Sequence, residues 1–211
     1  MKKSIKLFSM LLACLAMLLM SSCLGDDDND SKEKEWQEWL EDLQKEVVSS
    51  YGNYSGYVYF QPDVTVEKLD SVAATWSVVN DSTIDLRGVP ASLLVDKMPE
   101  QLSSLKEAIA AKGTVNIEVQ TIYNLYYMSP VYFYVYPKPV NLLVTIDGEE
   151  RSVVINFKTS GTESSSYGQY LMSNGRSLIK LYPESVVVNK NTVAQFNSAS
   201  CAFLYWLGQK L

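Results

Sequence analysis

The spacing of hydrophobic residues changes from a helical period to a strand period near residue 51. Over residues 32–50, large apolar side chains recur every three or four positions, which predicts an amphipathic helix. From Tyr51 onward, apolar and polar residues alternate with a period of two, which predicts β-strands. The folded part is therefore expected to begin with one helix and to continue as a β-rich domain.

The alternation is clearest between residues 114 and 157. Residues 114–127 predict a long, half-buried strand. In residues 131–136 two valines and a phenylalanine alternate with three tyrosines, which places the two sets on opposite faces of a second strand. Residues 140–146 and 153–157 flank Asp147-Gly148, a turn signal that predicts a β-hairpin. Upstream, residues 91–97 and 100–111 predict a short helical insertion that ends at Gly113.

About ten strands, many joined in hairpins and without regular strand–helix alternation, predict a mainly β fold that is α+β by content. The expected architecture is an antiparallel β-sandwich or barrel with an N-terminal amphipathic helix and a short helical insertion. The sandwich is favoured, and the barrel, which would provide a cavity, is the alternative. A lipocalin normally has Gly-x-Trp on its first strand, whereas Tyr54-Ser55-Gly56-Tyr57 stands here. The last apolar stretch, residues 199–207, predicts either a central strand or a buried helical turn.

The N-terminus has the pattern of an export signal. Three lysines precede an apolar run of about 14 residues, which is short of the roughly 20 needed to span a bilayer. The run ends in Met20-Ser21-Ser22-Cys23. This order resembles a bacterial lipoprotein signal, and the resemblance implies that Cys23 is the lipid attachment site and the first residue of the mature chain. Several acyl chains on one residue would anchor it firmly in a membrane.

An acidic segment follows Cys23. The predicted organisation is a lipoprotein signal peptide at 1–22, an acidic tether at 23–35 and a single β-rich domain at 36–211. A calcium loop beginning at Asp27 would need glycine at its sixth position, where Lys32 stands, so no metal site is predicted. Cys23-Leu-Gly-Asp-Asp-Asp is similar to the export signal of Bacteroidetes surface lipoproteins. That resemblance implies a lipid-anchored outer-membrane protein at the cell surface, with the periplasmic face as the alternative.

Charge and composition narrow the possible chemistry. The leader holds three of the 18 basic residues and none of the 24 acidic ones, so the mature chain carries 15 minus 24, or −9. This negative charge, without a basic cluster, argues against nucleic-acid binding. The absence of histidine excludes Ser-His-Asp and Cys-His catalysis and the usual zinc sites. Cys201 lies in an apolar run and is expected to be structural. No enzyme activity and no cofactor are predicted.

Tyrosine is the residue type that stands out, with 14 residues concentrated around positions 51–60 and 123–137. Its flat ring and polar tip suit stacking on sugars or contact with proteins. Tyrosines also pair well across strands, so a structural role is the alternative. The candidate ligand-binding residues are Tyr57, Tyr59, Tyr126, Tyr132, Tyr134 and Tyr136.

The anchor region, together with a short helix that leads into a Gly/Tyr-rich first strand, resembles small Bacteroidetes outer-membrane lipoproteins of a domain-of-unknown-function family. The expected function is a surface-anchored, non-enzymatic binding module for a glycan or an envelope protein partner, which predicts a solvent-facing aromatic strip. The first alternative is a lipocalin-like barrel that carries a small apolar ligand in a lined cavity. The second is a glycoside hydrolase, which needs two carboxylates about 5–10 Å apart.

Overall fold

The computed structural model describes residues 28–60, 70–128, 130–159, 166–196 and 204–211. The leader, Cys23 and Cys201 lie outside these residues. The chain divides into two units, Met1–Glu41 and Asp42–Leu211. The second unit contains the end of the first described helix and all of the strands.

The described helices are few and short apart from the first. α2 (Asp28–Ser49) begins four residues before the predicted helix and takes in part of the predicted tether. The insertion forms α3 (Ala91–Leu94), the 3₁₀ turn η1 (Glu100–Leu102) and α4 (Ser103–Ala110), and Gly113 follows with a φ of 74°. A second 3₁₀ turn is η2 (Met172–Asn174). None of the described helices combines the length and the apolar character needed to cross a membrane.

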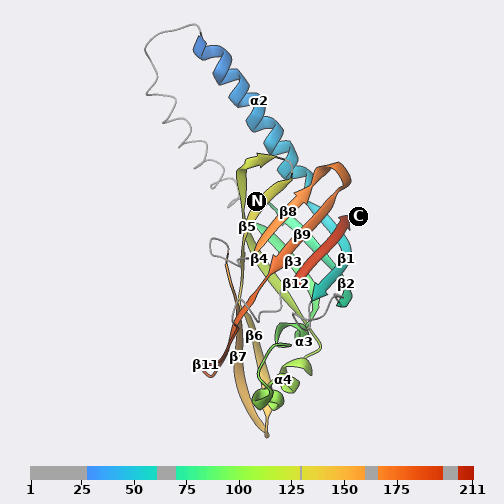
Figure 1. The fold of residues 1–211 in the computed structure, drawn as a ribbon, viewed down its shortest axis with the longest axis vertical. Coiled ribbons are helices and arrows are strands. Elements are labelled where there is room, and N and C mark those ends of the chain that lie inside the picture. The colour runs from blue at the N-terminus through green and yellow to red at the C-terminus, as the bar shows by residue number, and fades with distance from the viewer. Residues whose placement is uncertain (1–27, 61–69, 129, 160–165, 197–203) are drawn as a thin grey trace. The chain divides into compact units, whose positions relative to one another are not determined.

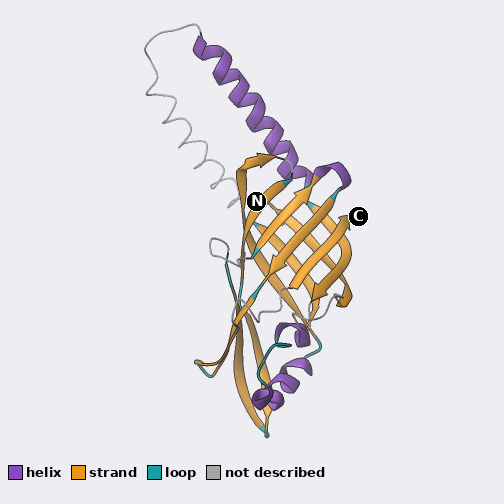
Figure 2. Ribbon diagram, in the orientation of Figure 1, coloured by secondary structure: helices purple, strands orange, loops and turns teal. Residues whose placement is uncertain are grey.

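Eight strands form a closed antiparallel barrel (Figures 1 and 2). Their order around the barrel is β1-β12-β9-β8-β5-β4-β3-β2. The barrel, rather than the favoured sandwich, is therefore the architecture, because β12 pairs with β1 and leaves no open edge. The barrel strands are β1 (Gly52–Phe60), β2 (Asp70–Asn80), β3 (Thr83–Pro90), β4 (Thr114–Met128), β5 (Val131–Pro137), β8 (Tyr167–Leu171), β9 (Arg176–Leu181) and β12 (Leu204–Lys210).

The other four strands form a second sheet in the order β11-β10-β7-β6. They are β6 (Val140–Ile146), β7 (Glu149–Phe157), β10 (Pro183–Val188) and β11 (Asn191–Gln195). β6 follows β5, and β10 follows β9, so two barrel strands lead directly into this sheet (Figure 1). The predicted hairpin is confirmed: Asp147 and Gly148 have φ values of 53° and 80°, as a two-residue turn between twisted strands requires.

Large side chains fill the inside of the barrel. Tyr54, Trp76 and Trp206 are at most 1% exposed, and the ring of Tyr54 stacks on that of Trp76 at 5.6 Å between centroids. Aliphatic side chains from the other barrel strands complete this core, among them Val58, Ile84, Leu86, Ile117, Val119, Val135, Ile179, Leu181 and Leu204. The part of the interior that the structure describes is thus packed like a protein core.

Two opposed glycines let the first and last strands approach closely. Gly56 and Gly208 are directly paired in the β1–β12 ladder. A Cβ atom at Gly208 would lie 2.3 Å from the backbone oxygen of Ser55 and 2.5 Å from the Trp76 ring. The indole of Trp76 therefore occupies the space that a side chain at Gly208 would take. In Tyr54-Ser55-Gly56-Tyr57, the glycine therefore allows β1 to pair closely with β12, which closes the barrel.

Candidate binding surface

The candidate tyrosines of β1 point away from the barrel core. Tyr57 is 51% exposed, whereas its neighbour Val58 is buried, as strict alternation along a strand requires. Tyr59 is half-buried because its ring lies against that of Tyr205, 5.4 Å away between centroids. β1 thus presents two aromatic rings to the outside.

The candidate tyrosines of β5 also point outward. Tyr132 and Tyr134 are 36% and 42% exposed, and Tyr136 is half-buried. The intervening Val131, Phe133 and Val135 are buried, so the predicted alternation is confirmed. The sixth candidate, Tyr126, belongs to β4, but its side chain lies outside the described part of the structure.

Strand pairing joins four of the candidates, Tyr57, Tyr59, Tyr132 and Tyr134, into two rows that run around the outside of the barrel. Tyr136 pairs with Gln120 of β4 and lies in neither row. Directly paired residues in adjacent strands place their side chains on the same side of the sheet. The first row is Tyr59, Tyr205, Lys180, Tyr167, Tyr134 and Ile122. The second row is Tyr57, Leu207, Leu178, Gln169 and Tyr132. We call the outward surface formed by both rows the tyrosine face; β8, β9 and β12, at its centre, lie side by side in Figure 1.

The two rows run side by side over five neighbouring strands, and Ile122 extends the first row onto β4. Adjacent strands lie about 4.8 Å apart, so four such steps, from β1 to β5, measure about 19 Å along the barrel surface. Tyr167, at the centre of the first row, is 37% exposed. The sequence did not single out Tyr167 or Tyr205, because their places in the row depend on pairing between segments far apart in the chain. Local alternation could not have indicated that Tyr205 points outward, because β12 is apolar on both faces around this residue.

Lys180 is the one charged member of the two rows. Its ammonium nitrogen lies 5.9 Å from the centroid of the Tyr167 ring and 5.0 Å from that of Tyr182. Aromatic faces attract cations at such distances. The two rings therefore hold the positive charge of Lys180 at the middle of the first row.

The end of α2 is hydrogen-bonded to three barrel strands, β1, β8 and β12, at one mouth of the barrel. The last carbonyl groups of a helix lack partners within the helix. Here Lys210 and Tyr170 donate to the carbonyl oxygen of Ser49, at 2.7 and 3.3 Å, and the Tyr54 hydroxyl donates to that of Ser50. Lys210 also places a cation at the negative end of the helix dipole.

Two tyrosines at this mouth, Tyr54 and Tyr123, have a raised pKa. Burial, opposed by the hydrogen bond with Ser50 and assisted by the charge of Asp81, raises the pKa of Tyr123 to about 12. Burial also raises the pKa of Tyr54. The Ser50 hydroxyl and the Tyr123 hydroxyl lie 3.0 Å apart and share a hydrogen bond. These groups tie the helix end to the barrel and do not form an acid–base pair.

Several carboxylates of the β-rich unit form ion pairs with lysine or arginine side chains on the surface. Glu118 contacts Lys138 at 2.6 Å, and Asp85 contacts Arg87 at 3.3 Å. Exposed pairs of this kind contribute little to stability. No group of three or more His, Cys, Asp or Glu side chains that could hold a metal ion occurs among the described residues.

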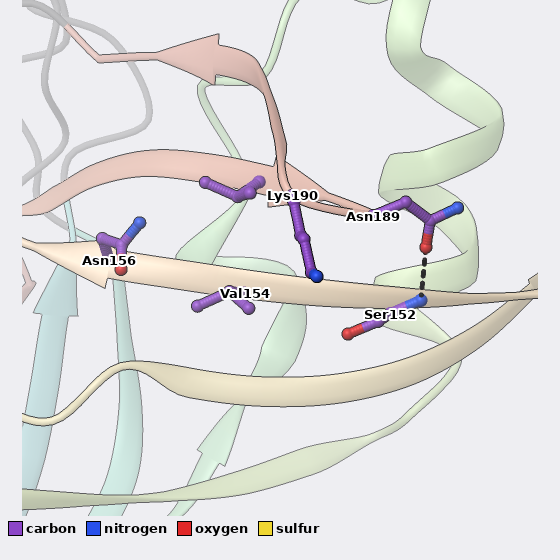
Figure 3. Close-up of a pocket in the computed structure, with 6 residues that line it drawn as sticks. Ser152, Val154, Asn156, Asn189 and Lys190 are labelled. Carbon is purple, nitrogen blue, oxygen red and sulfur yellow. Dashed lines mark hydrogen bonds between the residues drawn. The ribbon is translucent and has the colours of Figure 1, made fainter.

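A pocket lies on the second sheet, on the face opposite its buried side chains (Figure 3). Its lining comes from β7 and from the end of β10: Ser152, Val154, Asn156, Val187, Asn189 and Lys190. Two of the polar groups are already engaged, since Asn189 accepts a hydrogen bond from the Ser152 amide at 3.1 Å and Asn156 donates to Ser185 at 3.0 Å. We regard the tyrosine face as the stronger candidate because its members form one continuous surface.

Comparison with protein families matches residues 49–188 to one family, described as a domain of unknown function (DUF4840). The matched segment runs from the end of α2 through β10, and it includes β1, β5, β8 and β9 of the tyrosine face. Comparisons with curated proteins and with solved structures gave no match.

Proposed function

Because this chain belongs to the DUF4840 family, whose description states no activity, we propose a function from the barrel itself. The protein is a non-enzymatic binding module, and its tyrosine face holds a glycan. The observation that carries this proposal is the continuity of the two rows over five strands. Half-exposed tyrosine rings provide apolar faces for sugar rings and hydroxyls for their polar groups. Gln169, between Leu178 and Tyr132, adds an amide donor and acceptor.

The filled interior favours the outer surface over a lipocalin-like ligand cavity. A carrier of a small apolar ligand needs an apolar space of several hundred Å³. The centre of this barrel is occupied by Trp76, Trp206 and Tyr54. Asp85 and Glu118 are each paired with a basic side chain on the surface, and this arrangement likewise favours binding over a hydrolase that uses two carboxylates.

The binding test uses the full-length protein, solubilised in a non-ionic detergent, on a glycan array. We expect retention of at least one glycan, and we expect Tyr134→Ser combined with Tyr167→Ser to weaken it at least tenfold. Loss of two stacking contacts of about 1 kcal/mol each accounts for that factor. The matched control is Val79→Ser, which changes a 50% exposed apolar side chain on β2, outside the two rows.

An unchanged affinity in the double variant would remove the tyrosine face as the binding site. An array on which the wild-type protein binds nothing would favour the envelope protein partner as the ligand.

We also propose that acyl chains on Cys23 anchor the module in the outer membrane, at the cell surface. The support is the order of lysines, apolar run, small residues and cysteine in residues 1–23. Cys23→Ala is expected to move the protein from the membrane fraction to the soluble fraction after cell lysis. Incorporation of a labelled fatty acid should be lost in the same variant. Membrane association that persists in Cys23→Ala would overturn the anchor.

A further inference from the structure

We propose that the tyrosine face is selective for acidic polysaccharides, whose sugar rings carry carboxylate groups. This inference rests on the proposed glycan-binding function and adds the charge of the ligand to it. It is carried by the distribution of charged residues over the barrel strands, and by two cations on the outward side of β9, one in the tyrosine face and one beside it.

Five of the six strands that contribute to the tyrosine face contain no aspartate or glutamate, and the sixth, β4, contributes Ile122 and bears Glu118, which is paired with Lys138. The absence holds along the whole lengths of β1, β12, β9, β8 and β5, although the chain has 24 acidic residues against 18 basic ones. The acidic residues of the barrel strands fall on the remaining three: Asp70 on β2, Asp85 on β3 and Glu118 on β4. In this acidic protein, the outward side of β1, β12, β9, β8 and β5 therefore carries no carboxylate side chain. That side would not repel an anionic ligand.

The basic residues of these five strands are Arg176, Lys180 and Lys210. Lys210 donates to the Ser49 carbonyl at the barrel mouth, so its charge is engaged at the end of α2 and does not belong to the tyrosine face. Arg176 and Lys180 both lie on β9, an even number of residues apart, and therefore point to the same side of the sheet. Four residues of strand separate them by about 13 Å. The outward side of β9 thus carries two positive charges, Lys180 within the first row and Arg176 one outward position beyond Leu178 of the second row.

The surroundings of Lys180 place its charge where a stacked sugar would present an acidic group. In the first row Lys180 lies between Tyr205 and Tyr167. A sugar ring that stacks on Tyr167 brings its carboxylate within reach of the Lys180 ammonium, which has three N–H donors. Arg176 is exposed, and its guanidinium can bind a second carboxylate with two parallel hydrogen bonds.

The probes are polygalacturonate and its methyl-esterified form, which share one backbone and differ in charge. Affinity electrophoresis of the full-length protein is expected to show about tenfold tighter binding to polygalacturonate in 20 mM salt. Exposed ion pairs typically change an equilibrium by up to about fivefold each, and two such pairs account for this factor. In 0.5 M salt the preference should largely disappear, because counterions screen exposed charges.

Variants separate the charge from the stacking. Lys180→Met should reduce the preference for polygalacturonate three- to fivefold and leave binding of the ester unchanged, and Lys180→Arg should restore the preference. Arg87→Gln, on the side of the barrel that bears the acids, is the matched control and should change neither. Melting temperatures of all the variants verify that each is folded.

The outcomes distinguish this inference from the function on which it rests. Equal binding of both polymers, weakened by the Tyr134→Ser and Tyr167→Ser double variant, would overturn the charge selectivity and leave glycan binding in place. A preference for polygalacturonate that persists in Lys180→Met and Arg176→Gln combined would overturn the assignment to these cations. Binding of neither polymer would overturn the acidic-polysaccharide inference, and only an array without any retained glycan would also overturn glycan binding.

Discussion

Gly208→Ala is expected to lower the free energy of unfolding by about 3 kcal/mol, at the upper end of what overpacking costs. The added Cβ would lie 2.3 Å from the Ser55 carbonyl oxygen, a backbone atom that cannot move without parting β1 from β12. Gly208 does not have a positive φ, so the clash alone causes the loss. For a domain of this size the melting temperature should fall by about 6–12 °C.

Gly113→Ala is the control for this substitution. Gly113 has open space around the position of the new methyl group but a φ of 74°, so only the left-handed backbone opposes alanine there. Its cost should be about 1 kcal/mol. Equal losses at the two positions would show that the Gly56–Gly208 contact does not determine how closely the first and last strands approach.

Trp76→Ala is expected to lower the free energy of unfolding by about 3–5 kcal/mol. The Trp76 side chain is 1% exposed, stacks on Tyr54 and covers Gly208, so its removal leaves a large cavity at the centre of the barrel. Denaturation in urea, followed by circular dichroism, measures the loss. The slope of the transition should stay unchanged if the denatured state is unaffected.

Trp76→Phe tests how much of that loss comes from packing. The indole N–H of Trp76 is buried and has no hydrogen-bond partner among the described residues. Phenylalanine keeps most of the ring and removes this unpaired donor, which is costly to bury. We expect Trp76→Phe to lose less than half of what Trp76→Ala loses. A loss below 1 kcal/mol for Trp76→Ala would mean that the interior tolerates empty space, and would favour the lipocalin-like alternative.

Local patterns in the sequence predicted the individual elements well. The helix before residue 50, the outward tyrosines of β5 and the Asp147-Gly148 hairpin all follow from residues close together in the chain. Short-range periodicity and turn chemistry act over a few residues, so one sequence is enough to detect them. The second predicted helix was too long, because α3 ends at Leu94 instead of Lys97.

The barrel and the tyrosine face depend on contacts that no local pattern contains. Closure requires residues 52–60 to pair with residues 204–210, at a separation of about 150 residues. The same pairing places Tyr205 beside Tyr59, and the β5–β8 pairing places Tyr167 beside Tyr134. Several strands were predictable as amphipathic, but β12 was not, and a sandwich and a barrel bury the same alternating residues. The choice between them rests on register, which the alternation alone does not fix.

The pairing of β1 with β12 also bears on folding, because it joins segments far apart in the chain. β12 is the last strand of the barrel, so β1 and β9 each keep an unpaired edge until residues 204–210 are in place. Contacts between distant segments form slowly, because the closure of a long loop must precede any gain from the contact. The barrel is complete only once residues 204–210 have paired with both β1 and β9. Until then it has two open strand edges, which other chains could pair with, at the stage when the protein is most exposed to aggregation.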